Sequence, residues 1–293
     1  MFNFTQKTHN KADMHLHTAF SDGTDSPEEL IKRLRKHGVT TFSVTDHDNA
    51  DFYNNIKDND TYGLSLVTGI EFSCRTEKGK CHILGYGINT ENMDFVKTVE
   101  LTAKLREEKL QKRIDFLRDK HSIVLTDEEK ASLFKEKSAG KPHMARILMA
   151  RGYALSIGEA IDKYLTGIPG GDDRIDAKVA IDAIKKAGGI PVWAHPLGGE
   201  GEKRLTSEKF EERLLCLADM GIEGIELYYS RYGKKERTLI KRVLRKNKIK
   251  LVYSGGSDYH GANKNIVPGE LDCTGKPVLP KKITLLNDLK REQ

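Results

Sequence analysis

Histidine and acidic residues recur at or near the ends of short apolar segments along the whole chain. These segments are rich in β-branched residues and have the length of strands: residues 12–17, 41–45, 64–70, 81–86, 190–194, 224–228 and 250–254. His15 and His17 close the first segment. Because successive side chains of a strand alternate, this spacing places both imidazoles on one face. Such a chain must fold so that its strand ends can share one site.

The other histidines and acids follow the later segments in the same way. They are Asp46 and His47 after the second, Glu71 after the third, His82 within the fourth, His195 after the fifth, and Asp258 and His260 after the last. Helical patterns lie between the segments, and residues 27–36, between the capping Ser26 and Gly38, are an example. The alternation predicts repeated βα units around a parallel sheet or barrel.

The positions of these residues predict a metal site. In a closed parallel βα barrel the carboxyl ends of the strands form one rim, so residues far apart in the sequence converge on one pocket. A lone His-x-His is more often a packing or surface feature than a pair of ligands. Here, however, six of the ten histidines fall at the predicted rim. Imidazole and carboxylate together suit manganese, iron or zinc, and Glu71 has the chemistry to bridge two ions.

The alternation of strands and helices stops between about Asp94 and Gly171, where charged helical patterns contain no strong strand. We expect an inserted helical subdomain at residues 99–171. The metal-binding domain is then formed by residues 1–98 and 172–293.

Composition restricts the class of protein. No apolar run approaches the ~18 residues of a membrane span, and no charged segment followed by an apolar one opens the chain. The four cysteines form no CxxC pair, which indicates reduced thiols. We therefore expect a cytoplasmic protein with no membrane contact. The formal net charge of +6 suits an anionic substrate, and no motif for reading duplex DNA is recognisable.

A series of motifs follows along the chain: DMHLHTAFSDGTDSPEELI, FSVTDHDN, TGIEFSC, CHILGYGI, GKPHMARILMARGY, GGIPVWAHPLGG, GIEGIELYYSRY and SGGSDYHG. In content and order they resemble the polymerase and histidinol phosphatase (PHP) family of phosphoesterases. The chain is most similar to a bacterial branch with a helical insertion, which includes nucleoside 3′,5′-bisphosphate phosphatases and enzymes that trim short RNA from the 5′ end. The resemblance implies an α/β fold, a distorted (β/α)7 TIM-like barrel.

The resemblance also implies two or three divalent ions, manganese, iron or zinc. The implied ligands are His15, His17, Glu71 and Asp258 for the first ion, Glu71, His82 and His195 for the second, and Asp22, His47 and His260 for the third. Asp22 stands where other branches carry histidine. The implied attacking group is a hydroxide that bridges two ions and is held by Glu71, with His195 and Asp258 beside it. No protein nucleophile is expected.

Basic residues of the expected insertion are candidates for substrate phosphate contacts: Lys141, His143 and Arg146 in GKPHMAR, and Arg106 and Arg113 in the preceding helical pattern. The alternative is a solvated basic face, the usual role of long basic side chains. The family motif commonly reads Gly-Arg-Pro-His, so Lys141 is a departure. Lysine supplies a point charge without bidentate phosphate geometry.

Residues beside the expected ligands have supporting roles in this interpretation. Asp46 and Asp48 flank His47, and acids beside metal-bound histidines often orient them. A turn residue is an equal alternative for Asp48. Tyr228 and Tyr229 pack in the core or stack on a base, and Trp193 is a core residue.

We expect an enzyme that removes the 3′-phosphate of nucleoside 3′,5′-bisphosphates, hydrolyses short 5′-phosphorylated single-stranded oligonucleotides, or does both. One alternative is a histidinol-phosphate phosphatase or another small phosphomonoesterase. A second, from another class, is a non-catalytic metal-binding module. The filled ligand positions favour an enzyme, because converging polar groups usually mark a working site.

Overall fold

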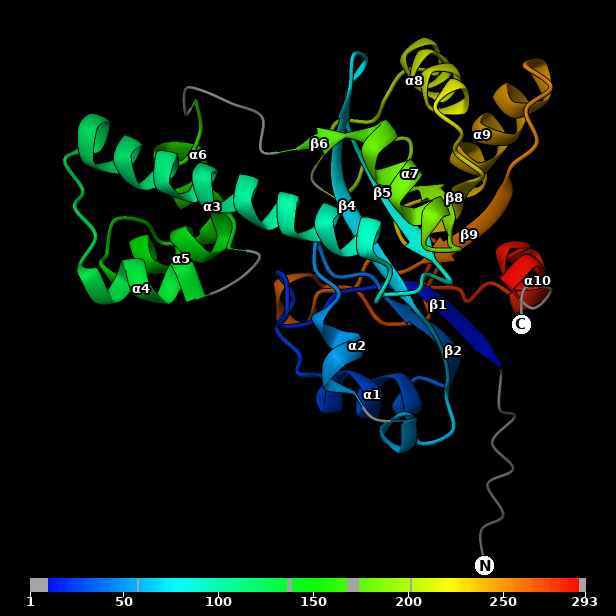
Figure 1. The fold of residues 1–293 in the computed structure, drawn as a ribbon, viewed down its shortest axis with the longest axis horizontal. Coiled ribbons are helices and arrows are strands. Elements are labelled where there is room, and N and C mark those ends of the chain that lie inside the picture. The colour runs from blue at the N-terminus through cyan, green and yellow to red at the C-terminus, as the bar shows by residue number, and fades with distance from the viewer. Residues whose placement is uncertain (1–9, 57, 136–138, 168–173, 201, 290–293) are drawn as a thin grey trace, which may run out of the picture.

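The computed structural model describes residues 10–56, 58–135, 139–167, 174–200 and 202–289, and Figure 1 shows their arrangement. The strands are β1 (Lys11–Leu16), β2 (Val39–Val44), β3 (Ser65–Val67), β4 (Gly69–Thr76), β5 (Gly79–Tyr86), β6 (Ile175–Asp176), β7 (Ile190–Trp193), β8 (Gly224–Tyr229) and β9 (Val252–Gly256). The helices are α1 (Pro27–Lys36), α2 (Asp51–Asn55), α3 (Met93–His121), α4 (Asp127–Lys135), α5 (Lys141–Ala150), α6 (Ile157–Tyr164), α7 (Ala177–Lys186), α8 (Ser207–Asp219), α9 (Lys234–Lys246) and α10 (Leu285–Leu289). The fold is therefore mixed α/β.

The strands form two sheets, with the orders β1-β2-β3 and β6-β4-β5-β7-β8-β9. The prediction of parallel strands throughout is wrong for the second sheet, because β5 runs antiparallel to both β4 and β7. The reason is local. Thr76 and Gly79 are partners across a tight turn, and Gly79 has a φ of 118°. A short turn joins only antiparallel strands, since a parallel connection needs a crossover of a dozen or more residues.

The segment predicted as one strand at residues 64–70 is divided in the structure. β3 pairs with β2, whereas β4 pairs with β5. At the start of β4 a Cβ on Gly69 would lie 2.2 Å from Oγ of Ser43, so only glycine allows this close approach. Glu71 consequently lies inside β4 and does not close a strand as predicted.

The two sheets meet at two isolated bridges, Leu16 with Tyr259 and His47 with Glu71. A Cβ on Gly256 would lie 2.1 Å from Cβ of His15, so this glycine lets β9 approach β1. The described strands form no continuously hydrogen-bonded closed barrel. The bridges nevertheless bring both sheets to the same place, and predicted site residues lie in or next to each bridge.

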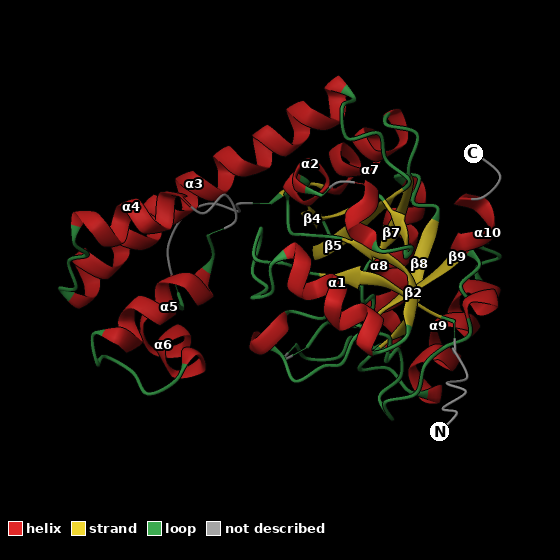
Figure 2. Cartoon of the chain, turned by 90° about the horizontal axis from the view of Figure 1, so that it is seen from below, coloured by secondary structure: helices red, strands yellow, loops and turns green. Residues whose placement is uncertain are grey.

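Helices cover the strands, and Figure 2 shows the strands gathered with α1, α7, α8 and α9 around them. Trp193 is 2% exposed and stacks on Phe210 at a ring distance of 5.4 Å, which confirms that it is a core residue. Local signals also place the helices. Before α1 the side chains of Ser26 and Glu29 each accept the other's backbone N–H, as in the predicted capping arrangement.

Helices α4, α5 and α6 and the distal half of α3 lie to one side of the sheets (Figures 1 and 2). They share a hydrophobic cluster separate from that of the sheets, which includes Leu117, Leu133, Met144 and Leu165. The proximal half of α3 instead contacts α7 beside the second sheet. None of the described helices has both the length and the apolar character needed to cross a membrane.

Candidate metal centre

The predicted ligands lie together around the bridge between β2 and β4. Three groups have donor atoms that all lie within 4.8 Å of one another: His17, Asp22, His47 and His260; His15, His17 and Glu71; and His47, Glu71 and His82. The groups share residues. The structure thus brings positions from both ends of the chain into one continuous cluster of imidazoles and carboxylates.

Glu71 is the centre of this cluster and is 1% exposed. Its Oε2 lies 3.3 Å from Nε2 of His15, 3.2 Å from Nε2 of His17 and 3.1 Å from Nδ1 of His47. Its Oε1 lies 2.9 Å from Nδ1 of His82 and 3.1 Å from Nε2 of His195. The two oxygens of one carboxylate therefore face two groups of imidazoles, which is the arrangement that a bridging ligand requires.

Asp258 and Asp22 complete the cluster on the side of β1 and β9. Oδ1 of Asp258 lies 3.6 Å from Nε2 of His15 and 3.4 Å from Nε2 of His17. Oδ1 of Asp22 lies 3.1 Å from Nε2 of His260. Asp258 has a φ of 59° and His195 a φ of 26°. Such backbone costs about 1–3 kcal/mol per residue outside glycine and is concentrated at functional sites.

Several potential metal-ligating atoms in the cluster make no hydrogen bond. Among the described residues, Nε2 of His15, Nε2 of His17 and Oδ1 of Asp22 are buried and make no hydrogen bond, although oppositely charged groups lie near. A buried polar atom without a hydrogen bond costs about 1–3 kcal/mol. Imidazole nitrogen and carboxylate oxygen are the donors that manganese, iron and zinc accept. The residues present therefore fit divalent ions.

The carboxylates stay ionised and some imidazoles hold protons. Burial acts to raise the pKa of Glu71, but the charges of His47, His15 and His82 hold it well below its usual value. Burial acts to lower the pKa of His17, but contacts with Asp258 and Glu71 raise it to about 9. A cation that takes the place of these protons binds more tightly as the pH rises.

Glu226 also belongs to the centre, although the sequence analysis did not select it. It is fully buried in β8; its Oε1 lies 3.0 Å from Nδ1 of His15, and its Oε2 accepts a hydrogen bond from the backbone N–H of His195 at 2.7 Å. A carboxylate on the far nitrogen of a ligating histidine fixes its orientation. The available signal was one acid between Ile225 and Leu227 in an apolar strand.

The change Glu226→Gln is expected to lower metal affinity by about 10–100-fold, the usual effect of removing a carboxylate that orients a metal-binding histidine. Glutamine keeps the shape but not the charge that faces His15. Competition with a chelating dye measures the affinity. Glu223→Gln is the matched control, because Glu223 lies just before β8 and pairs with Lys185 at the surface. Equal metal affinity in the two variants would contradict this role.

Asp258 is held by two further donors. Its Oδ2 accepts hydrogen bonds from the hydroxyl of Tyr229 at 2.9 Å and from Nζ of Lys264 at 2.8 Å. Oδ1 is then left facing the histidines. Tyr229 is fully buried, as expected of a core residue, but its hydroxyl contacts the cluster. No spacing in the sequence pointed to Lys264.

Asp46 and Asp48 support the loops around the cluster. Asp46 accepts hydrogen bonds from the backbone N–H of Thr18 at 2.8 Å and from its hydroxyl at 2.6 Å. Asp48 accepts the backbone N–H of Ser73 at 2.8 Å and forms an ion pair with Arg106. Arg106, a candidate phosphate contact, thus links α3 to the loop that carries His47.

Of the remaining basic candidates, Arg146 is linked to the cluster by hydrogen bonds. Arg146 donates to Oδ1 of Asn263 at 2.9 Å, and Asn263 donates to the carbonyl of Asp22 at 2.6 Å, so Arg146 lies beside the ligands. Nδ1 of His143 accepts the backbone N–H of Gly140 at 3.1 Å, which caps α5. Lys141 begins α5, and Arg113 is buried on α3.

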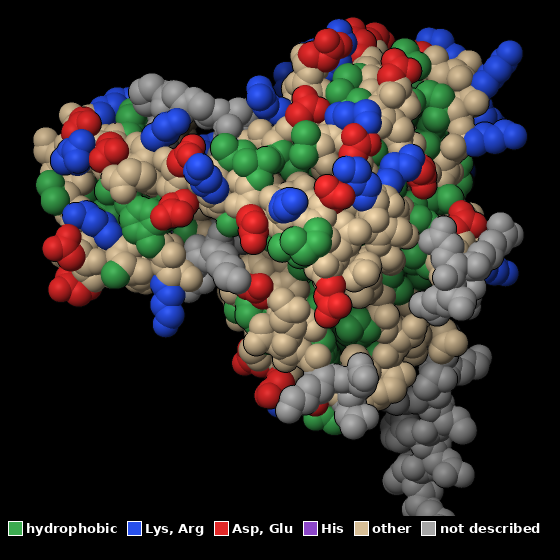
Figure 3. Space-filling model, viewed as in Figure 1, with side chains coloured by type: hydrophobic (Ala, Val, Ile, Leu, Met, Phe, Trp, Pro, Cys, Tyr) green, Lys and Arg blue, Asp and Glu red, His purple; other side chains and the backbone are tan. Residues whose placement is uncertain are grey.

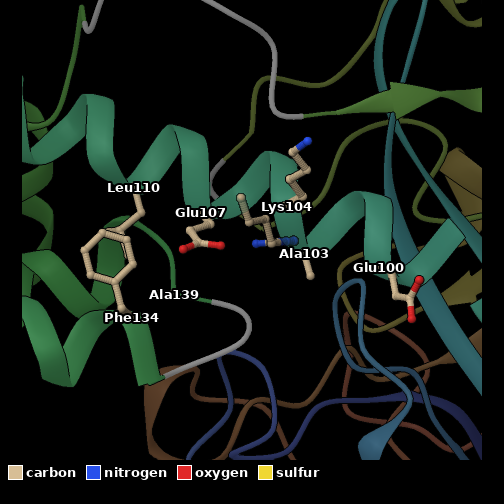
Figure 4. Close-up of a pocket in the computed structure, with 8 residues that line it drawn as sticks. Glu100, Ala103, Lys104, Glu107, Leu110, Phe134 and Ala139 are labelled. Carbon is tan, nitrogen blue, oxygen red and sulfur yellow. The ribbon is translucent and has the colours of Figure 1, made fainter. Parts of the chain in front are cut away.

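A cavity of about 360 Å³ lies along α3 next to the Arg106 link. Figure 4 shows Glu100 and Glu107 projecting from one side of α3, Lys104 projecting from the other side, and Phe134 facing α3 from α4. The two acids offset the basic side chains. This cavity is therefore not by itself a phosphate site.

Comparisons with known proteins agree with this geometry. The family model described as PHP domain matches residues 13–172. The chain is similar to a 5′-3′ exoribonuclease of Haemophilus influenzae, with 28% identity over 85% of this chain and 90% of the relative. It is also similar to a phosphoribosyl 1,2-cyclic phosphate 1,2-diphosphodiesterase of Eggerthella lenta, with 27% identity over 85% of this chain and 94% of the relative. A 3′,5′-nucleoside bisphosphate phosphatase of Chromobacterium violaceum is 26% identical, with 88% of each chain covered.

Among solved structures, a protein from Bifidobacterium adolescentis described as a metal-dependent phosphoesterase has the same fold. The TM-score is 0.75 at 24% identity, over 94% of this chain and 95% of that one.

Proposed function

The chain belongs to the PHP domain family of metal-dependent phosphoesterases, and we propose that its substrates are nucleoside 3′,5′-bisphosphates, short 5′-phosphorylated oligonucleotides, or both. The 3′-phosphate is the group removed from the bisphosphates. The observation that carries the proposal is the buried cluster in which the two oxygens of Glu71 face separate groups of imidazoles.

The proposed ion sites follow the three groups of ligands. They are His15, His17, Glu71 and Asp258; Glu71, His82 and His195; and Asp22, His47 and His260. Divalent ions bound there supply Lewis acidity, which lowers the pKa of water from 15.7 to about 7 and offsets phosphoryl charge. The protein's own contribution is orientation. Glu226 holds the His15 ring, and Tyr229 and Lys264 turn one oxygen of Asp258 towards the histidines.

The substrate class rests on the relatives and on the surface. The activities named for the relatives all concern phosphate esters of ribose or of ribonucleotides. On the face in Figure 3, basic and acidic side chains are interspersed and form no continuous basic band. Binding of a duplex requires a row of basic side chains on the protein. A surface of interspersed charges therefore suits a small phosphorylated molecule or a short single strand better.

The change Arg146→Ala is expected to raise KM for a nucleotide substrate by about 10-fold or more, because a hydrogen bond to a charged group contributes about 1.5–3 kcal/mol. A smaller effect on kcat is expected, since the metal ligands remain. Steady-state kinetics separates the two constants. Lys130→Ala on α4 is the control, because Lys130 pairs with Asp127 at the surface. A KM equal to that of the control would rule out a substrate contact for Arg146.

A substrate panel tests the proposed function. Manganese-loaded protein is incubated with adenosine 3′,5′-bisphosphate, short 5′-phosphorylated RNA and histidinol phosphate, and the products are identified. Release of the 3′-phosphate, or of nucleotides from the RNA, is expected. Activity on histidinol phosphate alone would replace the proposed substrate class. Hydrolysis of no phosphomonoester or diester by metal-loaded protein would favour the non-catalytic module.

We propose the domain boundaries as expected, with residues 99–171 inserted between 1–98 and 172–293. The separate hydrophobic cluster of α4 to α6 supports this division. We also propose that β1, β2, β4, β5, β7, β8 and β9 correspond to a distorted seven-stranded barrel. One bridge joins the ends of β1 and β9, and the other joins the end of β2 to β4. A cytoplasmic location is proposed from the cysteines. The chain has only four cysteines and no CxxC pair, which suits a reducing compartment.

A further inference from the structure

A second, smaller cavity opens at the end of the metal centre that His82 and His195 form. Both histidines line it, together with Arg174, Arg213, Lys80 and Glu202. Its volume is about 40 Å³. A single water needs ~10–15 Å³ by this measure, so the cavity admits a group larger than one water. Arg174 is not among the predicted site residues.

The backbone fixes the position of Arg174. It directly precedes β6, and the next residue, Ile175, is the partner of Cys74 on the edge strand β4. Nη1 of Arg174 is buried and, among the described residues, has no hydrogen-bond partner. Its charge acts with burial to lower the pKa of His82. The guanidinium therefore lies close to a proposed metal ligand.

Two of the other charged groups of the cavity already have partners. Arg213 donates to the carbonyls of Lys78 at 3.0 Å and Lys80 at 2.9 Å. Oε2 of Glu202 accepts the backbone N–H of Gly199 at 2.8 Å. A buried guanidinium nitrogen without a partner is costly, and a phosphoryl oxygen is the acceptor that a guanidinium matches best.

We propose that Arg174 binds a phosphoryl oxygen of the substrate at the His82 and His195 end of the metal centre. Arg146 lies at the other end, where it reaches Asp22 through Asn263. Two cations at opposite ends of the cluster suit a substrate with two phosphate groups. The inference rests on the proposed function in that the ligand is a phosphate ester.

The test is the binding of inorganic phosphate to the metal-loaded protein, measured by isothermal titration calorimetry. Arg174→Gln is expected to weaken binding at least about 10-fold, and Arg174→Lys less, since lysine keeps the charge. Arg75→Gln removes the same charge from an exposed position on β4 and is expected to bind phosphate as the wild type does. Metal content is expected to be equal in all four proteins.

The melting temperature without phosphate separates binding from a structural role. Arg174→Gln is expected to melt at the wild-type temperature or higher, because the change removes a guanidinium whose buried Nη1 has no hydrogen-bond partner among the described residues. Phosphate affinity equal to that of Arg75→Gln would overturn the inference. A loss of affinity accompanied by lost metal or a lower melting temperature would also overturn it, because Arg174 would then support the fold.

The outcome for Arg174 can be distinguished from the outcome for the proposed function. Arg174-dependent phosphate binding by a protein that hydrolyses nothing in the substrate panel would support the anion site and refute the function. Nucleotide hydrolysis by Arg174→Gln with wild-type KM and phosphate affinity would refute the anion site and support the proposed function.

Discussion

Glu71→Gln is expected to reduce the rate of phosphoester hydrolysis by at least about 10³-fold. Glu71 is the carboxylate that faces five of the six histidines of the cluster, and glutamine offers only one oxygen and no charge. Several kcal/mol of transition-state stabilisation depends on bound ions, and each 1.36 kcal/mol is a factor of ten in rate. The bound metal per chain is expected to fall with the rate, because the neutral amide no longer offsets ionic charge.

The measurement combines a rate assay with elemental analysis of the same sample, and circular dichroism checks that the fold is retained. Glu77→Gln is the matched control, since Glu77 lies in the turn after β4, is 72% exposed and pairs with Lys78. A Glu71→Gln enzyme with full metal content and a rate within tenfold of the control would show that Glu71 does not hold the ions.

Removal of the metal is expected to abolish activity and to lower the melting temperature. The difference in melting temperature between the metal-loaded and the metal-free protein is expected to widen between pH 6.5 and pH 9. The pKa of His17 is raised from 6.5 to about 9 in the metal-free protein. Protonated His17 contributes fully to the stability of the metal-free protein below pH 6.5, and this contribution is lost as the pH rises through 9. That loss is on the order of 3 kcal/mol, because one pKa unit corresponds to about 1.36 kcal/mol.

The metal-loaded protein is expected to behave in the opposite way over the same range. Its ions compete with protons for the imidazoles, so binding tightens as the pH rises. The pKa values of His15 and His195 are also raised. The pKa values of His47 and His82 are lowered, so these two residues lose their protons below this pH range. Thermal melts with and without a chelator measure the difference. His17→Gln is the control whose metal-free stability should depend less on pH. A difference that stays constant or narrows would contradict the electrostatics of the cluster.

The clustering of the histidines and acids was predictable because it depends on local signals. The alternation of His15 and His17 on β1, and acids beside short apolar segments, needed no knowledge of strand direction. The direction itself was predicted wrongly. The turn at Gly79 makes β5 antiparallel, so His82 reaches the cluster from within a hairpin and not from a parallel strand end.

Two of the residues that the sequence did not indicate act over long separations. Glu226 contacts His15 across 211 positions of sequence, and Asn263 joins Asp22 to Arg146 from another part of the chain. No spacing rule connects such residues. Arg106 was a candidate phosphate contact because it lies among basic residues of a helical pattern. In the structure its guanidinium pairs with Asp48, which lies 58 positions earlier in the chain. Such partners become visible only when packing brings the segments together.

Elemental analysis of the purified protein, coupled to phosphate release from adenosine 3′,5′-bisphosphate, tests the central claim most directly. The buried imidazole and carboxylate cluster predicts at least two manganese, iron or zinc ions per chain, and phosphate release that stops when they are removed and resumes when they are restored. A protein that binds no more than one ion per chain, or one whose phosphate release is unchanged after complete metal removal, would contradict the account.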